Sequence, residues 1–556
     1  MQNNFLDKIK ENLINKNFIE AENNIKLMLQ KDTNNDNLYN LLSIVYIEKN
    51  EISLATKILL KLIIKNPKFI DAEKNLCTLF EKKLSSIDAT KLYIELEKKS
   101  RLSYKLVISF CINQLINKNL NKAEILLQKV FELNKNDSVL YISLGIYFLN
   151  NSLISSAKKC FNKSLEINPK HDSAIVNLAY IYSNYELDYK KSILYLKKAI
   201  LLNPKNAVAH CNLGKIYIEI GKNKEGLDSY REALVIDKNH LRTQYNLGLY
   251  YLSIGNYRRG WDKYELRNKL IAKKKNIINL NYRIWDGVSK DSKLIIHAEQ
   301  GIGDEIIISS LFNELKDVRH EIEISCDKRL ISIFNRSFDG LKFFDRDNDT
   351  FNDDNYHIYS FSIAKYFRQS NDDFKKNKLS WLLSDKIKDS SVEERLKDTK
   401  KFKIGISWYS TGLQKKSIPL INLCKILNKD FFEIINLQYG DIKKETDNLY
   451  KETKEKILIF DDVDYRENID DIFSIINNCD LIITIDNATA QFAGALGKPT
   501  FLLLANNPMW YWGAEKISCW CPSIKIIRQL NPGDWTTVLK ELKYNLDNDI
   551  IPNKKL

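Results

Sequence analysis

The stretch "CNLGKIYIEIGKNKEGLDSYREALVIDKN" (211–239) decides how the first half of the chain folds. It contains a small residue, Gly214, directly after the apolar Leu213. A second small residue, Gly226, is followed four positions later by the large Tyr230. Apolar residues at helical spacing on both sides of a turn predict a helical hairpin, in which small residues let the helices approach and large ones fill the groove to the next hairpin.

The same pattern recurs through the first half of the chain at intervals of 34 or 35 residues. The apolar anchors are Leu42, Leu76, Phe110, Leu144, Leu178, Leu213 and Leu247. A fixed period of this length is typical of a solenoid built from repeated hairpins. The pattern resembles the tetratricopeptide repeat and covers about residues 2–268, or roughly eight units, with the first and last atypical.

A solenoid of this kind exposes a concave face that binds proteins or peptides, and it also acts as a docking or dimerisation scaffold. Asn177, Asn212 and Asn246 recur just before the anchors, where they would form an amide ladder suited to a bound backbone. Asparagine is also frequent throughout this chain, so the recurrence has a compositional explanation as well. Both interpretations are open at this point.

Length and composition indicate several soluble domains. The chain has 556 residues, and single hydrophobic cores stop growing at about 250–300 residues. Its 44% hydrophobic and 28% charged residues are close to the globular average, and the sequence has no apolar run of about 18 residues that would suggest an integral membrane segment. The N-terminus lacks the apolar core of a signal peptide, which predicts a cytoplasmic location.

The charge and cysteine patterns argue against two further kinds of site. The net charge is +14, but the lysines are spread along the chain without an arginine-aromatic stripe, so we expect a solvated surface and no nucleic-acid partner. The nine cysteines are scattered, and the close pair Cys519 and Cys521 lacks the spacing of a zinc site. We therefore expect reduced thiols and no metal.

Beyond the repeats the hydrophobic period changes to one of short strands. The predicted strands are 293–298, 321–326, 341–344 and 356–361, then 402–408, 432–438, 457–460, 480–486 and 500–504. Apolar strands alternating with amphipathic helices predict parallel sheets, here in two Rossmann-like domains, with the charged segment 384–401 as a helix or linker between them. Ligands bind at the carboxyl ends of such strands, so chemistry is expected after Ala298, Trp408, Gln438 and Asp486.

The first of these loops is "HAEQGIGDEIIISSL" (297–311). It has neither the third glycine of a dinucleotide fingerprint nor the Gly-Lys-Ser/Thr of a Walker loop. It does place Asp304 in the first turn of a helix, where backbone amides and the helix dipole would hold the carboxylate ionised. Asp304 is either a general base or a capping residue.

Two later loops offer groups suited to a diphosphate. The segment 407–420 carries hydroxyls with Lys415 and Lys416, which suit a leaving diphosphate or are simply solvated. In the segment 480–504 a helix starts after Asp486, and its free amides suit an anion, while Asp486 and Asn487 suit sugar hydroxyls. The pair Asp462 and Asp464 superficially resembles a metal site, but capping is the better interpretation.

These motifs together, in this order, resemble glycosyltransferase family nine, the heptosyltransferase-like enzymes, fused behind tetratricopeptide repeats. The motifs that carry the resemblance are "GWDKYELR" (260–267), "WDG" (285–287), "EQGIGDE" (299–305), the 407–420 segment, "LQYG" (437–440), "DLIITIDNATAQFAGALGKP" (480–499) and "GDW" (533–535). The resemblance implies an α-solenoid over 1–268 and a GT-B fold, with an acceptor domain over 269–398 and a nucleotide-sugar donor domain over 399–556.

The resemblance also implies roles for single residues. Asp304 would deprotonate an acceptor hydroxyl, with Gln300, Gly301 and Gly303 forming the acceptor-side loop. Lys416 would contact the donor phosphate. The other implied donor contacts are Ser407, Trp408, Gln438, Tyr439, Gly440, Asp486, Asn487, Thr489 and Gln491, and the loop from Tyr439 to Glu445 would read base and ribose. The reaction implied is inverting and metal-independent, with a nucleotide-diphosphate sugar as co-substrate and no cofactor.

One residue departs from the family pattern. Gln491 stands in "DNATAQFAG" where the family usually has histidine, and glutamine donates hydrogen bonds but carries no charge. Three functions therefore follow. The chain is a hexosyl- or heptosyltransferase-like enzyme acting on a protein presented by the repeats, a transferase building a surface glycan, or a non-catalytic scaffold with a decayed transferase domain.

Overall fold

The computed structural model describes residues 2–133, 136–271, 282–315, 321–348, 354–410, 416–506 and 508–550. By its internal packing the chain divides into two compact units, Met1–Pro204 and Lys205–Leu556. The first unit consists of helices, and the second contains further helices and two β-sheets.

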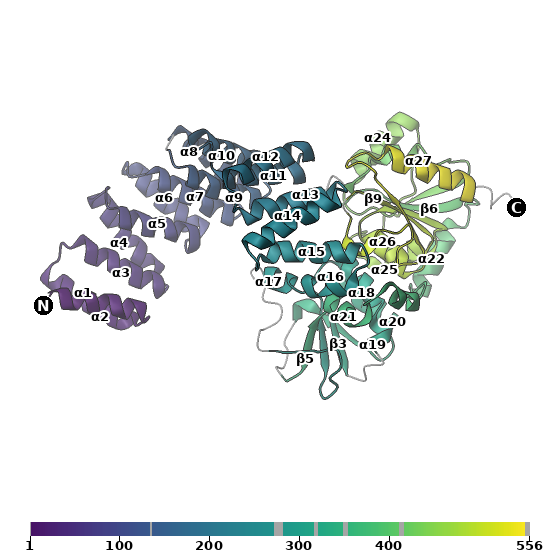
Figure 1. Ribbon diagram of the computed structural model, residues 1–556, viewed down its shortest axis with the longest axis horizontal. Coiled ribbons are helices and arrows are strands. Elements are labelled where there is room, and N and C mark those ends of the chain that lie inside the picture. The colour runs from purple at the N-terminus through teal and green to yellow at the C-terminus, as the bar shows by residue number, and fades with distance from the viewer. Residues whose placement is uncertain are drawn as a thin grey trace. The chain divides into compact units, whose positions relative to one another are not determined.

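The first unit is a run of helical hairpins, and Figure 1 shows its helices side by side in succession. They are α1 (Gln2–Ile14), α2 (Phe18–Lys31), α3 (Asp36–Glu48), α4 (Ile52–Lys65), α5 (Ile70–Lys82), α6 (Ser86–Lys98), α7 (Tyr104–Ile116), α8 (Leu120–Glu132), α9 (Ser138–Asn150), α10 (Ile154–Ile167), α11 (Asp172–Asn184) and α12 (Tyr189–Leu202). The predicted anchors are buried in one continuous core, from Leu42 to Leu178. The predicted helical solenoid is confirmed.

Close helix approach explains the small residues of the repeat. A Cβ atom added to Gly145 in α9 would lie 2.6 Å from the ring of Phe161 in α10. In the second unit, a Cβ at Gly214 would likewise lie 2.6 Å from the ring of Tyr230. The small residue and the large residue of one repeat are therefore in direct contact.

The second unit begins with more helices of the same kind. They are α13 (Ala207–Glu219), α14 (Asn223–Ile236), α15 (Leu241–Ser253), α16 (Tyr257–Tyr264) and α17 (Arg267–Ile271). Trp261 of α16 packs edge-on against Trp510 with ring centroids 5.3 Å apart, and its indole Nε1–H donates to the carbonyl oxygen of Arg368 at 2.6 Å. This last hairpin thus shares a core with both α/β lobes that follow it.

The first lobe is built on a five-stranded parallel sheet in the order β1-β5-β2-β3-β4. We call it the acceptor-side lobe, and the next one the donor-side lobe, after the roles that the sequence resemblance predicts for them. Its strands are β1 (Arg283–Ile284), β2 (Leu294–His297), β3 (Ile322–Cys326), β4 (Lys342–Asp345) and β5 (Tyr356–Tyr359). Its helices include α18 (Ile302–Ser309), α19 (Phe312–Leu315), α20 (Ile331–Ser337) and α21 (Ser360–Phe367). Strand β2 is buried along its whole length, as expected for a central strand covered on both faces.

The donor-side lobe has a five-stranded parallel sheet in the order β10-β9-β8-β6-β7. Its strands are β6 (Phe402–Ser407), β7 (Phe432–Asn436), β8 (Leu481–Ile485), β9 (Thr500–Leu504) and β10 (Ile524–Arg528). Its helices are α22 (Lys386–Leu396), α23 (Leu420–Cys424), α24 (Lys443–Thr453), α25 (Ile469–Asn477), α26 (Ala488–Ala495) and α27 (Thr536–Asn545). The strand order reverses beside β6, so the carboxyl ends of β6 and β8 border a crevice.

The strand predictions need three corrections. Strand β1 was not predicted, and only two of its residues, Arg283 and Ile284, form the strand. Residues 457–460 were predicted as a strand, but only Leu458 pairs, in a single bridge with Ile435. Strand β10 was not predicted, because its sequence "IKIIR" interrupts the apolar run with Lys525 and follows a cysteine-rich turn. The charged segment 384–401 does contain a helix, α22.

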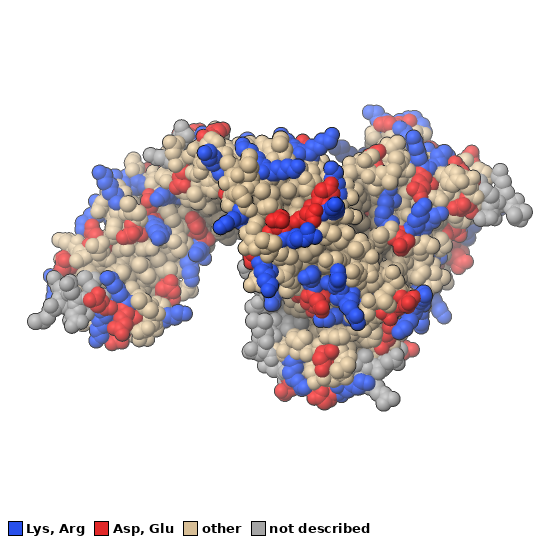
Figure 2. Space-filling view, viewed as in Figure 1, with Lys and Arg blue, Asp and Glu red and all other residues tan. Residues whose placement is uncertain are grey.

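Three general features of the chain concern its surface charge, its helices and its cysteines. Lys and Arg side chains are interspersed with Asp and Glu over the face shown in Figure 2. In the described part of the chain, no helix combines the length and apolar character needed to cross a membrane. All nine cysteines are described, and none forms a disulfide.

Candidate functional site

Asp304 lies in the first turn of α18, directly after the carboxyl end of β2. Its Oδ2 accepts the Gly301 backbone N–H at 3.2 Å, so the carboxylate also caps the helix. The other oxygen, Oδ1, is buried and has no well-formed hydrogen bond to any described residue. Only Oδ2 is therefore held by a well-formed hydrogen bond.

Burial changes the acidity of this group. Loss of solvation raises the pKa of Asp304 from 3.8 to about 6, and the hydrogen bond from the Gly301 amide opposes this only in part. With a pKa of about 6 the carboxylate is still mostly ionised at pH 7, but the helix start alone does not set its acidity. The prediction from the sequence considered the helix end alone, whereas tertiary packing around α18 sets the larger effect.

The acceptor-side loop is fixed from both flanks. The amide Nε2 of Gln300 donates to the hydroxyl of Tyr264 at 2.8 Å, which ties the loop to the last helical hairpin. Arg346 donates to the carbonyl oxygen of Gln300 at 3.1 Å and to the carboxylate of Glu305 at 2.7 Å. Sequence patterns gave no sign of Arg346, which follows the end of β4.

Asp486 and Lys416 form a buried ion pair on the donor-side lobe. Lys416 Nζ lies 2.5 Å from Asp486 Oδ2, and both side chains are less than 10% exposed. Asp486 also accepts the indole N–H of Trp512 at 2.7 Å and the backbone N–H of Met509 at 3.2 Å. The predicted phosphate lysine thus lies beside the predicted sugar-binding loop, at the carboxyl end of β8.

Asn487 caps α26 and links the ends of two strands. Its Oδ1 accepts the Thr489 backbone N–H at 3.1 Å, and its Nδ2 donates to Ser407 Oγ at 2.7 Å. Gln438 Oε1 accepts from Ser407 Oγ at 3.0 Å and from the backbone N–H of Trp408 at 2.9 Å. The predicted donor residues at the ends of β6, β7 and β8 are therefore gathered into one network.

The loop after β7 supplies the remaining predicted donor residues. Tyr439 is half-buried, and the exposed Gly440 turns the chain with a φ of +88°, a conformation that favours glycine. The carboxylate of Glu445, at the start of α24, accepts the indole N–H of Trp408 at 2.7 Å. This loop is consequently attached to the same edge of the sheet.

The two lobes meet where α18 and α26 begin. A Cβ added to Gly303 would lie 3.1 Å from the side-chain amide of Gln491, so a larger residue would have to displace this amide slightly. Gln491 Nε2 donates to the hydroxyl of Tyr511 at 2.9 Å, and that hydroxyl also interacts with the Asp304 carboxylate. Tyr511 and Trp512 were missed in the sequence, although the aromatic run "MWYWG" (509–513) was a usable signal.

Some predicted residues have other roles or lie elsewhere. Lys415 falls outside the described residues, as does the rest of 411–415. Asp464 accepts the backbone N–H groups of Arg466 and Glu467, so it caps a turn as expected. In the described part of the chain, no group of three or more His, Cys, Asp or Glu side chains could hold a metal ion.

The amide ladder predicted on the repeats stays a prediction. Asn177 is half-buried, and its Nδ2 donates to the carbonyl oxygen of Ser173 in its own helix. Asn246 Nδ2 lies 3.6 Å from Cys211 Sγ on the neighbouring hairpin. Their amide donors thus already have partners within the protein.

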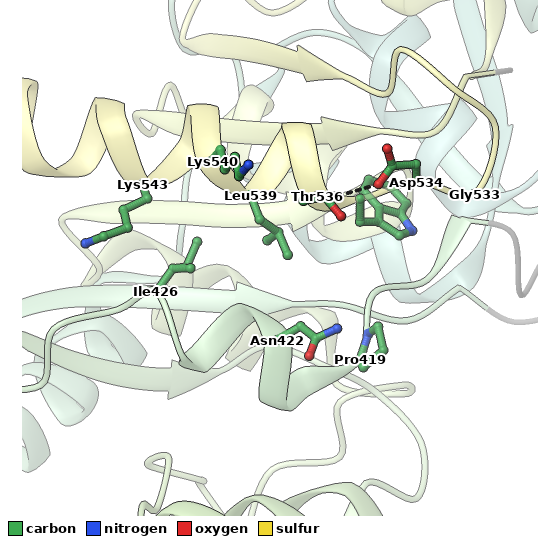
Figure 3. A pocket seen from close by; sticks show the side chains of 10 residues that line it. Pro419, Asn422, Ile426, Gly533, Asp534, Thr536, Leu539, Lys540 and Lys543 are labelled. Carbon is green, nitrogen blue, oxygen red and sulfur yellow. Dashed lines mark hydrogen bonds between the residues drawn. The ribbon is translucent and has the colours of Figure 1, made fainter.

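A pocket of about 510 Å³ lies on the donor-side lobe between α23 and α27. Figure 3 shows Asn422 and Ile426 facing Thr536, Leu539 and Lys543 across it. Gly533 and Asp534 of the "GDW" motif line one end. None of the residues predicted to bind the donor sugar, base or phosphate lines this pocket.

Residues 195–228 match the tetratricopeptide repeat. Among curated proteins, the chain is 23% identical to Protein FlbA of Caulobacter vibrioides over 274 residues, which are 45% of this chain and 46% of FlbA. It is 24% identical to the anaphase-promoting complex subunit CDC16 of Saccharomyces cerevisiae over 128 residues, 22% of this chain and 15% of that protein. The chain thus spans less than half the length of these relatives.

Solved structures resemble each half separately. A glycosyl transferase family 9 protein from Veillonella parvula aligns with 48% of this chain and 99% of its own, at 12% identity and a TM-score of 0.38. MamA aligns with 30% of this chain and 95% of its own, at 20% identity and a TM-score of 0.24. The repeat match identifies residues 195–228 as a tetratricopeptide repeat, whereas these low similarities assign no activity.

Proposed function

We propose that the protein is a glycosyltransferase that moves a sugar from a nucleotide-diphosphate sugar to a hydroxyl acceptor, without a metal and with inversion at the anomeric carbon. The observation that carries the proposal is Asp304. It is a buried carboxylate whose Oδ1 has no well-formed hydrogen bond to a described residue, it faces the start of α26 on the other lobe, and its pKa is raised to about 6. In this proposal the two lobes form a GT-B pair.

Asp304 has the properties of a general base. The Gly301 amide holds Oδ2, which orients the carboxylate, and Oδ1 is left to accept a proton. A base is most effective when its pKa lies near the working pH, because it is then ionised and still basic. Burial of Asp304 supplies this condition.

The donor-side lobe supplies cations and amides for the leaving group. A diphosphate at the start of α26 would meet free backbone N–H groups and the positive end of the helix dipole. Lys416 has three N–H donors, one of which serves Asp486. We assign the others to the diphosphate and give Asp486 the role of orienting Lys416.

The proposed reaction is a single displacement. The acceptor oxygen bonds to the anomeric carbon while its proton passes to Asp304 Oδ1. The bond from the anomeric carbon to the diphosphate oxygen breaks, and its electron pair leaves with the nucleoside diphosphate. Lys416 and the amides of α26 stabilise that developing charge.

The acceptor side is supported by contact between the last hairpin and the cleft. Tyr245 of α15 stacks on Tyr264, with ring centroids 5.9 Å apart, and lies within electrostatic reach of Asp304 and Glu299. The helical hairpins would therefore border the place where the acceptor hydroxyl must enter. We propose that the repeats recruit the acceptor, a protein or a glycan-bearing partner, at this side.

Binding of nucleotide sugars tests the proposal. Calorimetry with ADP-, UDP- and GDP-sugars should find one class that binds with a dissociation constant below about 1 mM. The variant Lys416→Met should weaken that binding at least tenfold, whereas Lys540→Met, in the separate α23–α27 pocket, should leave it unchanged. If none of the three classes binds, the scaffold function replaces the transferase.

A truncation then separates protein acceptors from glycan acceptors. A chain beginning at Lys205 retains both lobes and the last hairpins. With a protein acceptor, this chain should still hydrolyse the donor but lose transfer to polypeptide. Unchanged transfer by the truncated chain would assign the first unit to another partner.

A further inference from the structure

Tyr511 lies at the junction of the two lobes and is buried. It belongs to the short helix η6 (Trp510–Trp512), which follows strand β9. Its ring stacks on Phe361 of the acceptor-side lobe, with planes 12° apart and centroids 6.5 Å apart. Only 3% of its surface is exposed, so the hydroxyl must find its partners inside the protein.

The hydroxyl of Tyr511 has one proton and two neighbours, the Gln491 amide and the Asp304 carboxylate. A carboxylate only accepts hydrogen bonds, whereas an amide can present either its N–H₂ or its oxygen. The Tyr511 proton therefore goes to Asp304, and the phenolic oxygen accepts from Gln491 Nε2 at 2.9 Å. This order fixes which way round the Gln491 amide lies.

The consequence is an amide oxygen without a hydrogen-bond partner among the described residues, at the junction of the two lobes. With Nε2 bound to Tyr511, Oε1 of Gln491 faces Gly303, where an added Cβ would lie only 3.1 Å away. Gln491 is 3% exposed, and its Oε1 has no hydrogen-bond partner among the described residues. A buried amide oxygen without a partner is costly to maintain unless a ligand supplies a donor.

We propose that Tyr511 is a positioning residue that orients Asp304 and holds the Gln491 amide so that its oxygen receives a hydroxyl hydrogen of the substrate. An amide oxygen repels phosphate, so Gln491 would recognise a hydroxyl group of the donor sugar or of the acceptor. The inference rests on the proposed transferase function. It also gives Gln491 the role of a hydrogen-bond acceptor, which a charged histidine would not fill because both of its ring nitrogens are donors.

Several charged and titratable groups face Asp304 besides Tyr511. They are Asp486 at the end of β8, Glu299 in the acceptor-side loop, Glu305 in α18 and Tyr245 on α15. Asp486 and Glu299 raise the pKa of Asp304, while the Tyr511 hydroxyl lowers it. Removing that hydroxyl should therefore move the titration of Asp304 to higher pH.

A titration that needs no substrate tests the proposal. In full-length protein labelled with ¹³C at aspartate carboxyls, one signal should titrate near pH 6 and vanish in Asp304→Asn. In Tyr511→Phe its midpoint should rise by about 0.5 pH unit or more, since each hydrogen bond to a carboxylate favours its charged form. Tyr257→Phe removes another buried hydroxyl, which contacts Cys519, and should leave the midpoint unchanged.

A more acidic phenol at position 511 keeps the hydroxyl and should shift the Asp304 midpoint in the opposite direction. Difluorotyrosine placed at position 511 donates more strongly and should lower the same midpoint. An unchanged midpoint in both variants overturns the proposal, even if nucleotide sugars bind. Conversely, these shifts remain measurable if no nucleotide sugar binds, so the two proposals fail separately.

The source of the hydroxyl is found with Gln491→Met. If the hydroxyl belongs to the donor sugar, this variant weakens sugar-nucleotide binding about tenfold but not binding of the free nucleoside diphosphate. If it belongs to the acceptor, donor binding stays the same and the KM for acceptor rises. Unchanged donor binding and unchanged KM would remove Gln491 from the proposal.

Discussion

Asp304 and Asp486 occupy equivalent places in the two lobes, yet their surroundings differ. Each follows the carboxyl end of a parallel strand and lies at or next to the start of a helix, α18 and α26 respectively. Asp486 is saturated by Lys416, Trp512 and the backbone of Met509. Asp304 has one backbone hydrogen bond to Oδ2, and its Oδ1 is left without a well-formed one.

The difference separates a structural carboxylate from a reactive one. The oxygens of Asp486 already accept from Lys416, Trp512 and the backbone of Met509. A buried carboxylate with too few donors is poised near neutral pH, at a cost to folding stability. The proposed mechanism uses both, one to hold the lysine and one to accept the proton.

The largest expected effect on folding stability comes from removing the Asp486 carboxylate. Asp486→Ala leaves Lys416 buried without its counter-charge and should lower the free energy of unfolding by about 3–5 kcal/mol. Urea denaturation measures this difference. The double variant Asp486→Leu with Lys416→Met should recover most of the loss, and failure to recover would mean that the pair is not the source of the stability.

Removing the charge of Asp304 should instead increase the free energy of unfolding. The pKa of Asp304 is raised by burial from 3.8 to about 6, so ionisation of this group favours the unfolded chain. The resulting loss of folding stability grows between those two pH values and persists above them. Asp304→Asn should therefore raise the free energy of unfolding at pH 7.5 by about 1–2 kcal/mol, after allowing for solvent screening. The gain should disappear below about pH 4.

A matched aspartate provides the control for this measurement. The pKa of Asp534 is lowered by the Thr536 backbone N–H, so Asp534→Asn should give no stabilisation at pH 7.5. Equal stabilisation by both substitutions would attribute the effect to overall charge instead of burial.

The smallest expected effect concerns the contact between the lobes. Gly303→Ala pushes a methyl group against Gln491 and should reduce transfer about tenfold by displacing the amide, while the alanine itself suits the helix. Gly301→Ala meets only the Asp304 carboxylate at 3.6 Å, an ordinary contact, and should retain near-normal transfer. Similar activities for the two variants would show that the Gly303–Gln491 approach is unimportant.

The parts of the molecule differ in how far sequence predicts them. The repeats were predictable because Gly145 and Phe161, and their equivalents at each period, meet within one hairpin. Strands β6 and β8 were predictable as continuous apolar runs, and so was the placing of Asp304 and Asn487 at helix starts. Local pattern is sufficient for all of these.

The rest depends on packing between segments distant in the sequence. Tyr511 and Trp512 come from a loop without a catalytic motif, and only the folded chain brings them to Asp304 and Asp486. The raised pKa of Asp304 follows from burial by those same segments. The ion pair of Lys416 with Asp486 likewise joins residues 70 positions apart.

The most direct test of the central claim compares donor affinity with turnover in Asp304→Asn. The account predicts an unchanged dissociation constant for the nucleotide sugar and a rate of transfer reduced about 10²–10⁴-fold, the usual contribution of a general base. Calorimetry and single-turnover release of nucleoside diphosphate in the presence of acceptor measure the two quantities on one sample. A variant that binds the donor and transfers at the wild-type rate would contradict the assignment of Asp304 as the base.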